Sequence, residues 1–230
     1  MLDIIVSDRW HATFEGGHIG VLAIGGVDNS QPSPLLNERK RILESKLRER
    51  FRGYARNDYF ELKVLKAYRD YYKQFGNTYH VQAQLESVVG GRSLPNVSPL
   101  VDANFAAELE TLVLTAGHDA DLLKAPVTID ATQGGEAFTQ LNGKTRTLKP
   151  HDMMMRDGAG TVCTILYGQD KRTPISPKTT RALYVAYAPV GVGAEAVSAQ
   201  LEAVRDNVLL FATDAEVELL ELYSAEGEDA

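Results

Sequence analysis

The segment 127-VTIDATQGGEAFTQLNGKTRTLKPHDMMMRDGAGTVCTILY-167 decides the fold class of this chain. Apolar and polar residues alternate in short runs, which is typical of strands with one buried face. The pairs Asn142-Gly143 and Asp157-Gly158 separate such runs and favour tight hairpin turns, because their residue types tolerate the left-handed backbone that these turns require. The pattern predicts antiparallel strands at 127–131, 136–141, 145–149, 152–156 and 161–167.

Downstream of this segment, the spacing of the apolar residues changes from a strand pattern to a helix pattern and back. Residues 181–188 read as another apolar strand, 194–212 as a helix with apolar residues four and three apart, and 216–223 as a last strand. The final residues, 225–230, are predicted to form a disordered acidic tail.

Upstream, the chain is mostly helical. Two apolar runs near the start predict short strands, and helices follow at 30–54 and 58–75, the second carrying tyrosines that we expect to pack in the core. A third helix should begin at Ser98 as N-cap, with Pro99 in its first turn. Helices followed by a mostly antiparallel sheet predict an α+β fold.

Composition limits the class of protein. The 230 residues are 44% hydrophobic and 24% charged, as in ordinary globular proteins, and no apolar run reaches the roughly 20 residues of a membrane helix, so the chain is expected to be cytoplasmic. The five histidines are scattered and Cys163 lies in an apolar strand, so neither a metal nor a cofactor is expected. The net charge of −7 argues against DNA binding, although residues 38–73 hold twelve of the 24 basic residues.

Polar residues stand out in the helix that begins at Pro99. Asp102 suits the first turn of a helix, where the dipole favours a negative charge. Asn104 is a poor helix former among apolar neighbours, so either a structural hydrogen bond or a ligand contact explains it. His118 follows Gly117, and we place it on a turn after the helix.

A long polar connection between two strands, 168–180, is the second candidate region. Long ordered loops often carry function, and this one offers charged groups, hydroxyls and stiffening prolines. The candidate residues in it are Asp170, Arg172, Thr173, Ser176 and Thr179.

Several segments in order resemble a known family. The stretches 65-LKAYRDYYKQFG-76, 92-RSLPNVSPLVDANFAAEL-109, 117-GHDAD-121, 134-GGEAFTQLNG-143 and 168-GQDKRTPISPKTTRALYVAY-187 are similar to the editing module (B-three/B-four domain) of the phenylalanyl-tRNA synthetase beta subunit, in its free-standing form. The resemblance implies antiparallel sheets in a layered, sandwich-like core flanked by helices. It also suggests three parts: strands and a basic helix at 1–56, an editing-like domain at 57–224, and the tail at 225–230.

The resemblance also implies site residues. In the synthetase this module hydrolyses tyrosine wrongly esterified to the phenylalanine tRNA, and its pocket asparagine and histidine match Asn104 and His118. Asp121 matches the end of the histidine motif, and the family glutamate falls near Asp170 or Lys171. Small pocket residues of the next strand fall near Tyr184 and Ala186, where the tyrosine would change the volume.

Three functions fit these patterns. The first is an aminoacyl-tRNA deacylase that acts in trans for translation fidelity, with His118 activating a water, Asn104 fixing the substrate, and Arg48, Arg50 and Arg52 holding tRNA phosphates. The second is a binding module for RNA or an amino acid, and the third is a hydrolase of other esters or amides. We expect Asn104, His118 and the loop 168–179 to line one cleft.

Overall fold

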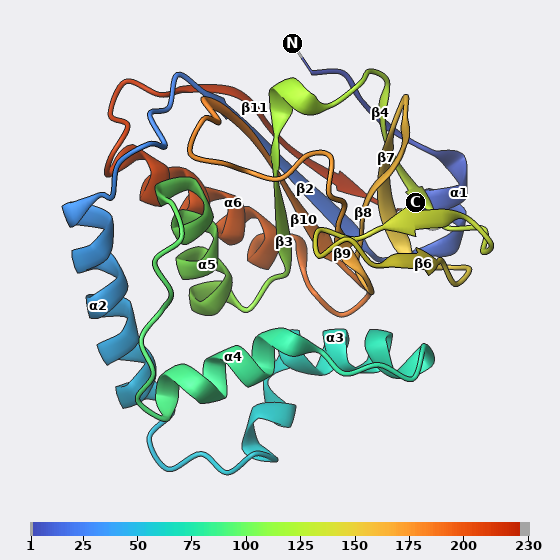
Figure 1. The fold of residues 1–230 in the computed structure, drawn as a ribbon. Coiled ribbons are helices and arrows are strands. Elements are labelled where there is room, and N and C mark those ends of the chain that lie inside the picture. Colours follow the sequence, from blue (N-terminus) through green and yellow to red (C-terminus); the bar gives the residue numbers. More distant parts are fainter. Residues whose placement is uncertain (1, 226–230) are drawn as a thin grey trace.

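The computed structural model describes residues 2–225 (Figure 1). The elements follow one another along the chain as β1 (Ile4–Val6), α1 (Asp8–Thr13), β2 (His18–Gly25), α2 (Pro34–Arg50), the short 3-10 helix η1 (Asp58–Glu61), α3 (Lys63–Gln74), α4 (His80–Val89), α5 (Pro99–Thr111), β3 (Thr115–Asp119), η2 (Ala120–Leu122), β4 (Val127–Ala131), β5 (Ala137–Thr139), β6 (Thr145–Thr147), β7 (Met153–Asp157), β8 (Gly160–Thr164), β9 (Gly168–Gln169), β10 (Arg181–Ala188), α6 (Ala194–Leu209) and β11 (Glu216–Ser224).

The strands form two main sheets. One has the order β1-β4-β7-β8-β9, the other β11-β2-β10-β3, and a separate hairpin joins β5 and β6. All pairs are antiparallel except β1 with β4. The predicted α+β class with mostly antiparallel sheets is confirmed, and Figure 1 shows the β11-β2-β10-β3 sheet between α5 and α6 on one side and β4, β7 and β8 on the other.

The second sheet is assembled from both ends of the chain. β2 pairs along its whole length with β10 on one side and β11 on the other. The first 56 residues therefore contribute an interior strand to a sheet whose other strands belong to residues 57–224. Helix α6 packs closely on this sheet at Gly20, where an added Cβ would lie 2.5 Å from Val197.

Tyrosine hydroxyls connect α3 and the start of α4 to β10, to the residue after β8 and to the end of α5. Tyr68 donates to the carbonyl of Tyr187 at 2.6 Å, Tyr72 to that of Ile165 at 2.7 Å, and Tyr79 to that of Leu112 at 3.1 Å. Because all three side chains are buried, each hydroxyl needs such a partner, and a backbone carbonyl supplies it. The prediction that the tyrosines of residues 58–75 pack in the core is confirmed for Tyr68 and Tyr72.

The predicted helix start at Ser98 needs one correction. Pro99 does open α5, but the Ser98 side chain makes no capping bond. Asn29 replaces it: its Oδ1 accepts from the backbone N–H of Leu100 at 2.8 Å, while its Nδ2 donates to Ser98 at 3.3 Å. The cap comes from a loop about 70 residues away in sequence, a separation that local pattern reading cannot detect.

Asp102 also differs from its simple prediction. It forms a buried ion pair with Lys40 of α2, with Nζ 2.7 Å from Oδ2, and its Oδ1 accepts from the backbone N–H of Val97 at 2.9 Å. Lys40 additionally donates to the carbonyl of Pro95 and to Asn96. Asp102 therefore joins two helices rather than serving only the helix dipole.

Two helices were not predicted, and one residue was placed on the wrong element. Residues 8–13 and 80–89 form α1 and α4. The predicted turn at His118 is wrong, because α5 ends at Leu112 in the left-handed region, at φ 66°, and His118 lies in β3. The predicted acidic tail lies outside the described residues, except for Ala225. Among residues 2–225, no helix has the length and apolar character needed to cross a membrane.

Candidate functional site

A cavity of about 610 Å³ lies where α4, α5, β3 and the segment from Cys163 to Ile175 meet. This volume is in the range of pockets that hold small molecules. Its wall is mainly apolar, with residues such as Val101, Phe105, Leu114 and Ile175, and a few polar groups interrupt it. A second cavity of about 420 Å³ adjoins it and shares His80, Gln84 and Phe105.

Asn104 lines the large cavity, as predicted. Its Nδ2 donates to the carbonyl of Thr115 at 2.9 Å, and its Oδ1 accepts from Gln200 Nε2 at a long 3.5 Å. Asn104 therefore makes a structural hydrogen bond and also lines the cavity. The amide oxygen, held only by the long contact, retains capacity to accept from a ligand or a water.

Glu108 is a cavity residue that the sequence interpretation missed. It lies one helical turn after Asn104 on α5, is 4% exposed, and lines the same cavity. Its Oε1 accepts from the backbone N–H of Thr115 at 3.0 Å, while burial raises the pKa of its carboxyl to about 8. A carboxyl four residues after an out-of-place asparagine, on the same helix face, was the available signal.

His118 does not line the cavity. Its side chain is fully buried, and burial lowers its pKa to about 3, so the ring is neutral at physiological pH. Its Nδ1 lies 3.0 Å from Thr173 Oγ1 and 3.2 Å from Gln169 Nε2, whereas its Nε2 has no hydrogen-bond partner. Because the Thr173 hydroxyl donates its proton to Asp170 at 2.8 Å, the Thr173 oxygen accepts from His118.

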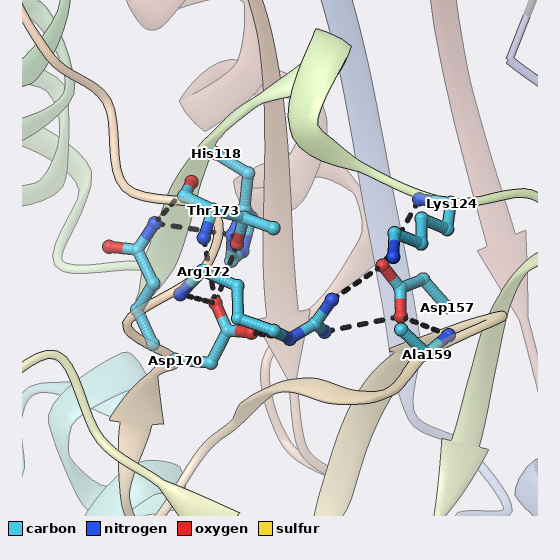
Figure 2. Close-up of polar contacts among 8 residues, drawn as sticks. His118, Lys124, Asp157, Ala159, Asp170, Arg172 and Thr173 are labelled. Carbon is cyan, nitrogen blue, oxygen red and sulfur yellow. Dashed lines mark hydrogen bonds and ion pairs between the residues drawn. The ribbon is translucent and has the colours of Figure 1, made fainter. Parts of the chain in front are cut away.

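Figure 2 shows how ion pairs and hydrogen bonds hold the loop after β9. Asp170 accepts from the backbone N–H groups of Arg172 and Thr173, and Arg172 lies between two carboxylates, 2.8 Å from Asp170 and 3.1 Å from Asp157. Asp157 also accepts from the backbone of Lys124 and Ala159. Arg172 therefore pairs with two carboxylates at once, which commits its charge to the protein.

The remaining predicted substrate residues lie outside the cavity wall. Thr179 donates to Asp119 at 2.6 Å and accepts from the backbone N–H of Ser176 at 2.9 Å, which fastens the loop. Asp121 is largely exposed and lies 3.5 Å from Arg181. Their neighbours Gln169, Pro174 and Ile175 line the cavity instead.

In β10 too, the residue that lines the cavity stands next to a predicted one. The buried Tyr184 donates to the carbonyl of Leu100 at 2.9 Å, and Ala186 is also buried, but neither lines the cavity. Tyr187 lines it, and its hydroxyl is buried without a hydrogen-bond partner. Successive residues of a strand face opposite sides, so an error of one position changes the face.

Gly117 lets the loop approach β3 closely. An added Cβ at this position would lie 2.9 Å from Ile175 and 3.0 Å from the Tyr184 ring. The main chain of Gly117 also accepts from Gln169 Nε2 at 2.6 Å. A glycine is therefore required where this strand, the loop and the cavity meet.

The three arginines predicted to bind RNA differ in whether their side chains are already bonded within the protein. Arg48 donates to the carbonyls of Val88 and Arg92, so it ties α2 to the end of α4. Arg50 lies 4.9 Å from the ring of Phe51, and both Arg50 and Arg52 are exposed. Arg50 and Arg52 remain candidates for phosphate contacts, whereas Arg48 has a structural role.

No metal site accompanies the cavity. Across residues 2–225, no group of three His, Cys, Asp or Glu side chains is arranged to hold a metal ion. The polar groups that line the cavity are amides, hydroxyls, a thiol, a histidine and one carboxyl.

Comparisons with known proteins place this fold in a family. An N-terminal fragment of the phenylalanyl-tRNA synthetase beta subunit from Pyrococcus horikoshii has a similar structure, with a TM-score of 0.50 and 11% sequence identity. The match covers 94% of this chain and 50% of that fragment, so the chain spans half of its length, and at this identity the likeness shows the fold alone. No curated protein matches the chain. The family model of the B3/4 domain matches residues 67–205, more than half of the chain, which therefore belongs to the B3/4 domain family.

Proposed function

We propose that this protein binds the aminoacyl group of a mischarged aminoacyl-tRNA in the large cavity and hydrolyses its ester in trans. The observation that carries this proposal is the cavity itself: about 610 Å³, mainly apolar, with Asn104, Gln169 and Glu108 at separate points of its wall. Such a site suits an apolar amino-acid side chain joined to a polar ester. The shared fold with a synthetase beta-subunit fragment supports this substrate class.

The chemistry demands little of the protein. An aminoacyl ester is already activated, so holding a water against the acyl carbon supplies much of the acceleration. The water oxygen forms a bond to that carbon, the bond to the ribose oxygen breaks, and the ribose oxygen takes up a proton. We assign to the Asn104 amide oxygen the orientation of the water, and to Gln169, whose Nε2 donates to the carbonyls of Gly117 and Thr173, the shaping of the wall beside it.

His118 takes a positioning role in this proposal. It is neutral and buried, and it contacts the two residues that shape the loop, Thr173 and Gln169. Its hydrogen bond to Thr173 extends the chain of contacts that begins at Asp170. His118 therefore holds the cavity wall in place, and the water acts on the other side of that wall.

The proposed partner is tRNA, with Arg50 and Arg52 as phosphate contacts and the cytoplasm as the place of action. Charge reversal of both arginines should weaken tRNA binding and reduce the slope of log affinity against log salt by about 0.7–0.9 for each phosphate that the protein no longer neutralises. Arg205→Glu on α6 is the control. A slope that stays unchanged in the double variant argues against this surface.

The activity is tested with tRNAs that carry wrong amino acids, including tyrosine on phenylalanine tRNA. Ala116→Leu places extra carbon atoms in the large cavity, and Ala83→Leu does so only in the second cavity. We expect wild type and Ala83→Leu to release the amino acid and Ala116→Leu to be at least about tenfold slower, as expected when reactants are displaced. No release from any charged tRNA, or full activity in Ala116→Leu, contradicts the proposal.

A further inference from the structure

Glu108 has one oxygen held by the protein and one available to the cavity. Its Oε1 accepts from Thr115, and within residues 2–225 its Oε2 has neither a hydrogen bond nor an ion pair. The side chain is nonetheless almost entirely removed from solvent, since only 4% of the residue is exposed. A carboxyl oxygen in such a place needs a partner from within the cavity, either a water or a polar group of a ligand.

The surroundings of Glu108 contain no compensating positive charge. Neither lysine nor arginine lines the cavity. The titratable groups near the carboxyl from α3 and the start of α4 are the phenols of Tyr68, Tyr72 and Tyr79 and the imidazole of His80. Burial raises the pKa values of the phenols and lowers that of the imidazole, which favours the neutral form of each. Burial raises the pKa of the Glu108 carboxyl to about 8, so the carboxyl holds a proton at neutral pH until a ligand ammonium group beside it favours the ionised form.

The lack of a basic side chain on the cavity wall disfavours a ligand that carries a carboxylate. A free amino acid would bring its own negative charge into an enclosed space where no guanidinium or ammonium group of the protein pairs with it. An aminoacyl ester or amide has the amine without the carboxylate.

We propose that Glu108 binds the free α-ammonium group of the aminoacyl moiety, so that the cavity selects unblocked aminoacyl esters and amides over free amino acids and N-acylated forms. The choice of an aminoacyl ligand rests on the proposed function, whereas the selection for a free amine rests on the cavity alone. The apolar remainder of the wall then holds the amino-acid side chain.

Binding of three small probes tests this selection without any need for hydrolysis. The probes are tyrosine amide, N-acetyl-tyrosine amide and free tyrosine, titrated into the full chain by calorimetry. Wild type should bind tyrosine amide at least tenfold more tightly than either of the other two. Glu108→Gln, which keeps the shape and loses the charge, should reduce that preference to less than threefold.

Glu110→Gln is the matched control, because Glu110 lies on the same helix but pairs with Arg39 at the surface. It should keep the wild-type preference, and thermal unfolding should show both variants folded. Equal affinity for the three probes, binding of none of them, or an unchanged preference in Glu108→Gln overturns the inference. Selective binding of tyrosine amide without release from any charged tRNA leaves the inference standing and removes the hydrolytic function.

Discussion

Two residues of α5 show how much the type of a single residue in the sequence reveals about its place in the structure. An amide is out of place among apolar helix neighbours, which makes Asn104 a candidate from sequence, and it does line the cavity. Glu108 meets the same criterion one turn later, so its position could have been predicted. His118 could not be placed, because its location depends on α5 ending at Leu112, a residue type that rarely adopts a positive φ.

Substitution of His118 separates a positioning role from direct catalysis. Asn retains a hydrogen-bonding group near the position of Nδ1 and has nothing at Nε2, whereas Ala removes the group that donates to the Thr173 oxygen and leaves only the bond from Thr173 to Asp170. We expect kcat of His118→Asn to stay within about threefold of wild type and that of His118→Ala to fall about tenfold, as the loss of a buried hydrogen bond predicts. The pH profile of His118→Asn should match that of wild type.

Rates measured over a pH series check this expectation. If His118→Asn is folded and as inactive as His118→Ala, the unpartnered Nε2 takes part in the reaction and the proposed positioning role is wrong.

Glu108 should make stability depend on pH. Burial raises its pKa to about 8 in the folded protein, above the ordinary glutamate value of about 4.3 in the unfolded chain. Between these values the folded protein holds a proton that the unfolded chain has lost. The stabilisation is therefore complete below about pH 4.3 and is lost as pH rises through about 8, at no more than about 1.4 kcal/mol per pH unit.

Urea unfolding of wild type and Glu108→Gln at about pH 5, 6.5 and 8 measures this contribution, because other titrations cancel in the difference. The Gln variant should gain stability relative to wild type as the pH rises. A constant difference between the two proteins at all three pH values would show that Glu108 does not titrate in this range.

At the scale of elements, α2 and α5 are joined by the buried pair of Lys40 and Asp102, whose side chains are 4% and 7% exposed. Lys40→Met removes the charge that compensates Asp102 and also leaves the carbonyl of Pro95 without its donor. We expect a loss of about 3–5 kcal/mol in the free energy of unfolding. Arg41→Met, at an exposed position next in the chain, should change it by less than about 0.5 kcal/mol.

Urea unfolding of both variants gives these values. A loss for Lys40→Met as small as that of Arg41→Met would mean that the pair does not hold the two helices together.

Elements with strong local signals were predictable, and elements set by tertiary contacts were not. Alternation and hairpin turns located β4 to β8, and the apolar stripe located α2, with Leu36, Leu43 and Leu47 all buried. α1 has only six residues, with Trp10 as its buried anchor, too short for a helical period to be recognised. α4 carries several polar residues and depends on packing against α2 and α5.

On the scale of the whole molecule, the order of strands was not readable from the sequence. β2 and β11 lie almost 200 residues apart, yet they pair from Gly25 with Glu216 to His18 with Ser224. Each strand pattern indicates a buried face but does not specify a partner so distant in sequence. The cavity depends on this topology, since β3 reaches its position by pairing with β10.

This topology predicts that residues 1–56 cannot be removed. Deletion of residues 2–56 takes away β2, and with it the hydrogen-bonding partner of both β10 and β11 and the surface on which α6 packs at Gly20. We expect the remaining chain to lose its cooperative thermal transition and the slow amide hydrogen exchange of β10.

Deletion of residues 2–6 is the matched control, because it removes only β1, an edge strand that pairs with β4 alone. This shorter deletion should lower the melting temperature and keep a single cooperative transition, since an edge strand supports one neighbour whereas β2 supports two. A cooperative transition in the chain that lacks residues 2–56 would show instead that residues 57–224 fold by themselves, with the first 56 residues as an addition to a complete core.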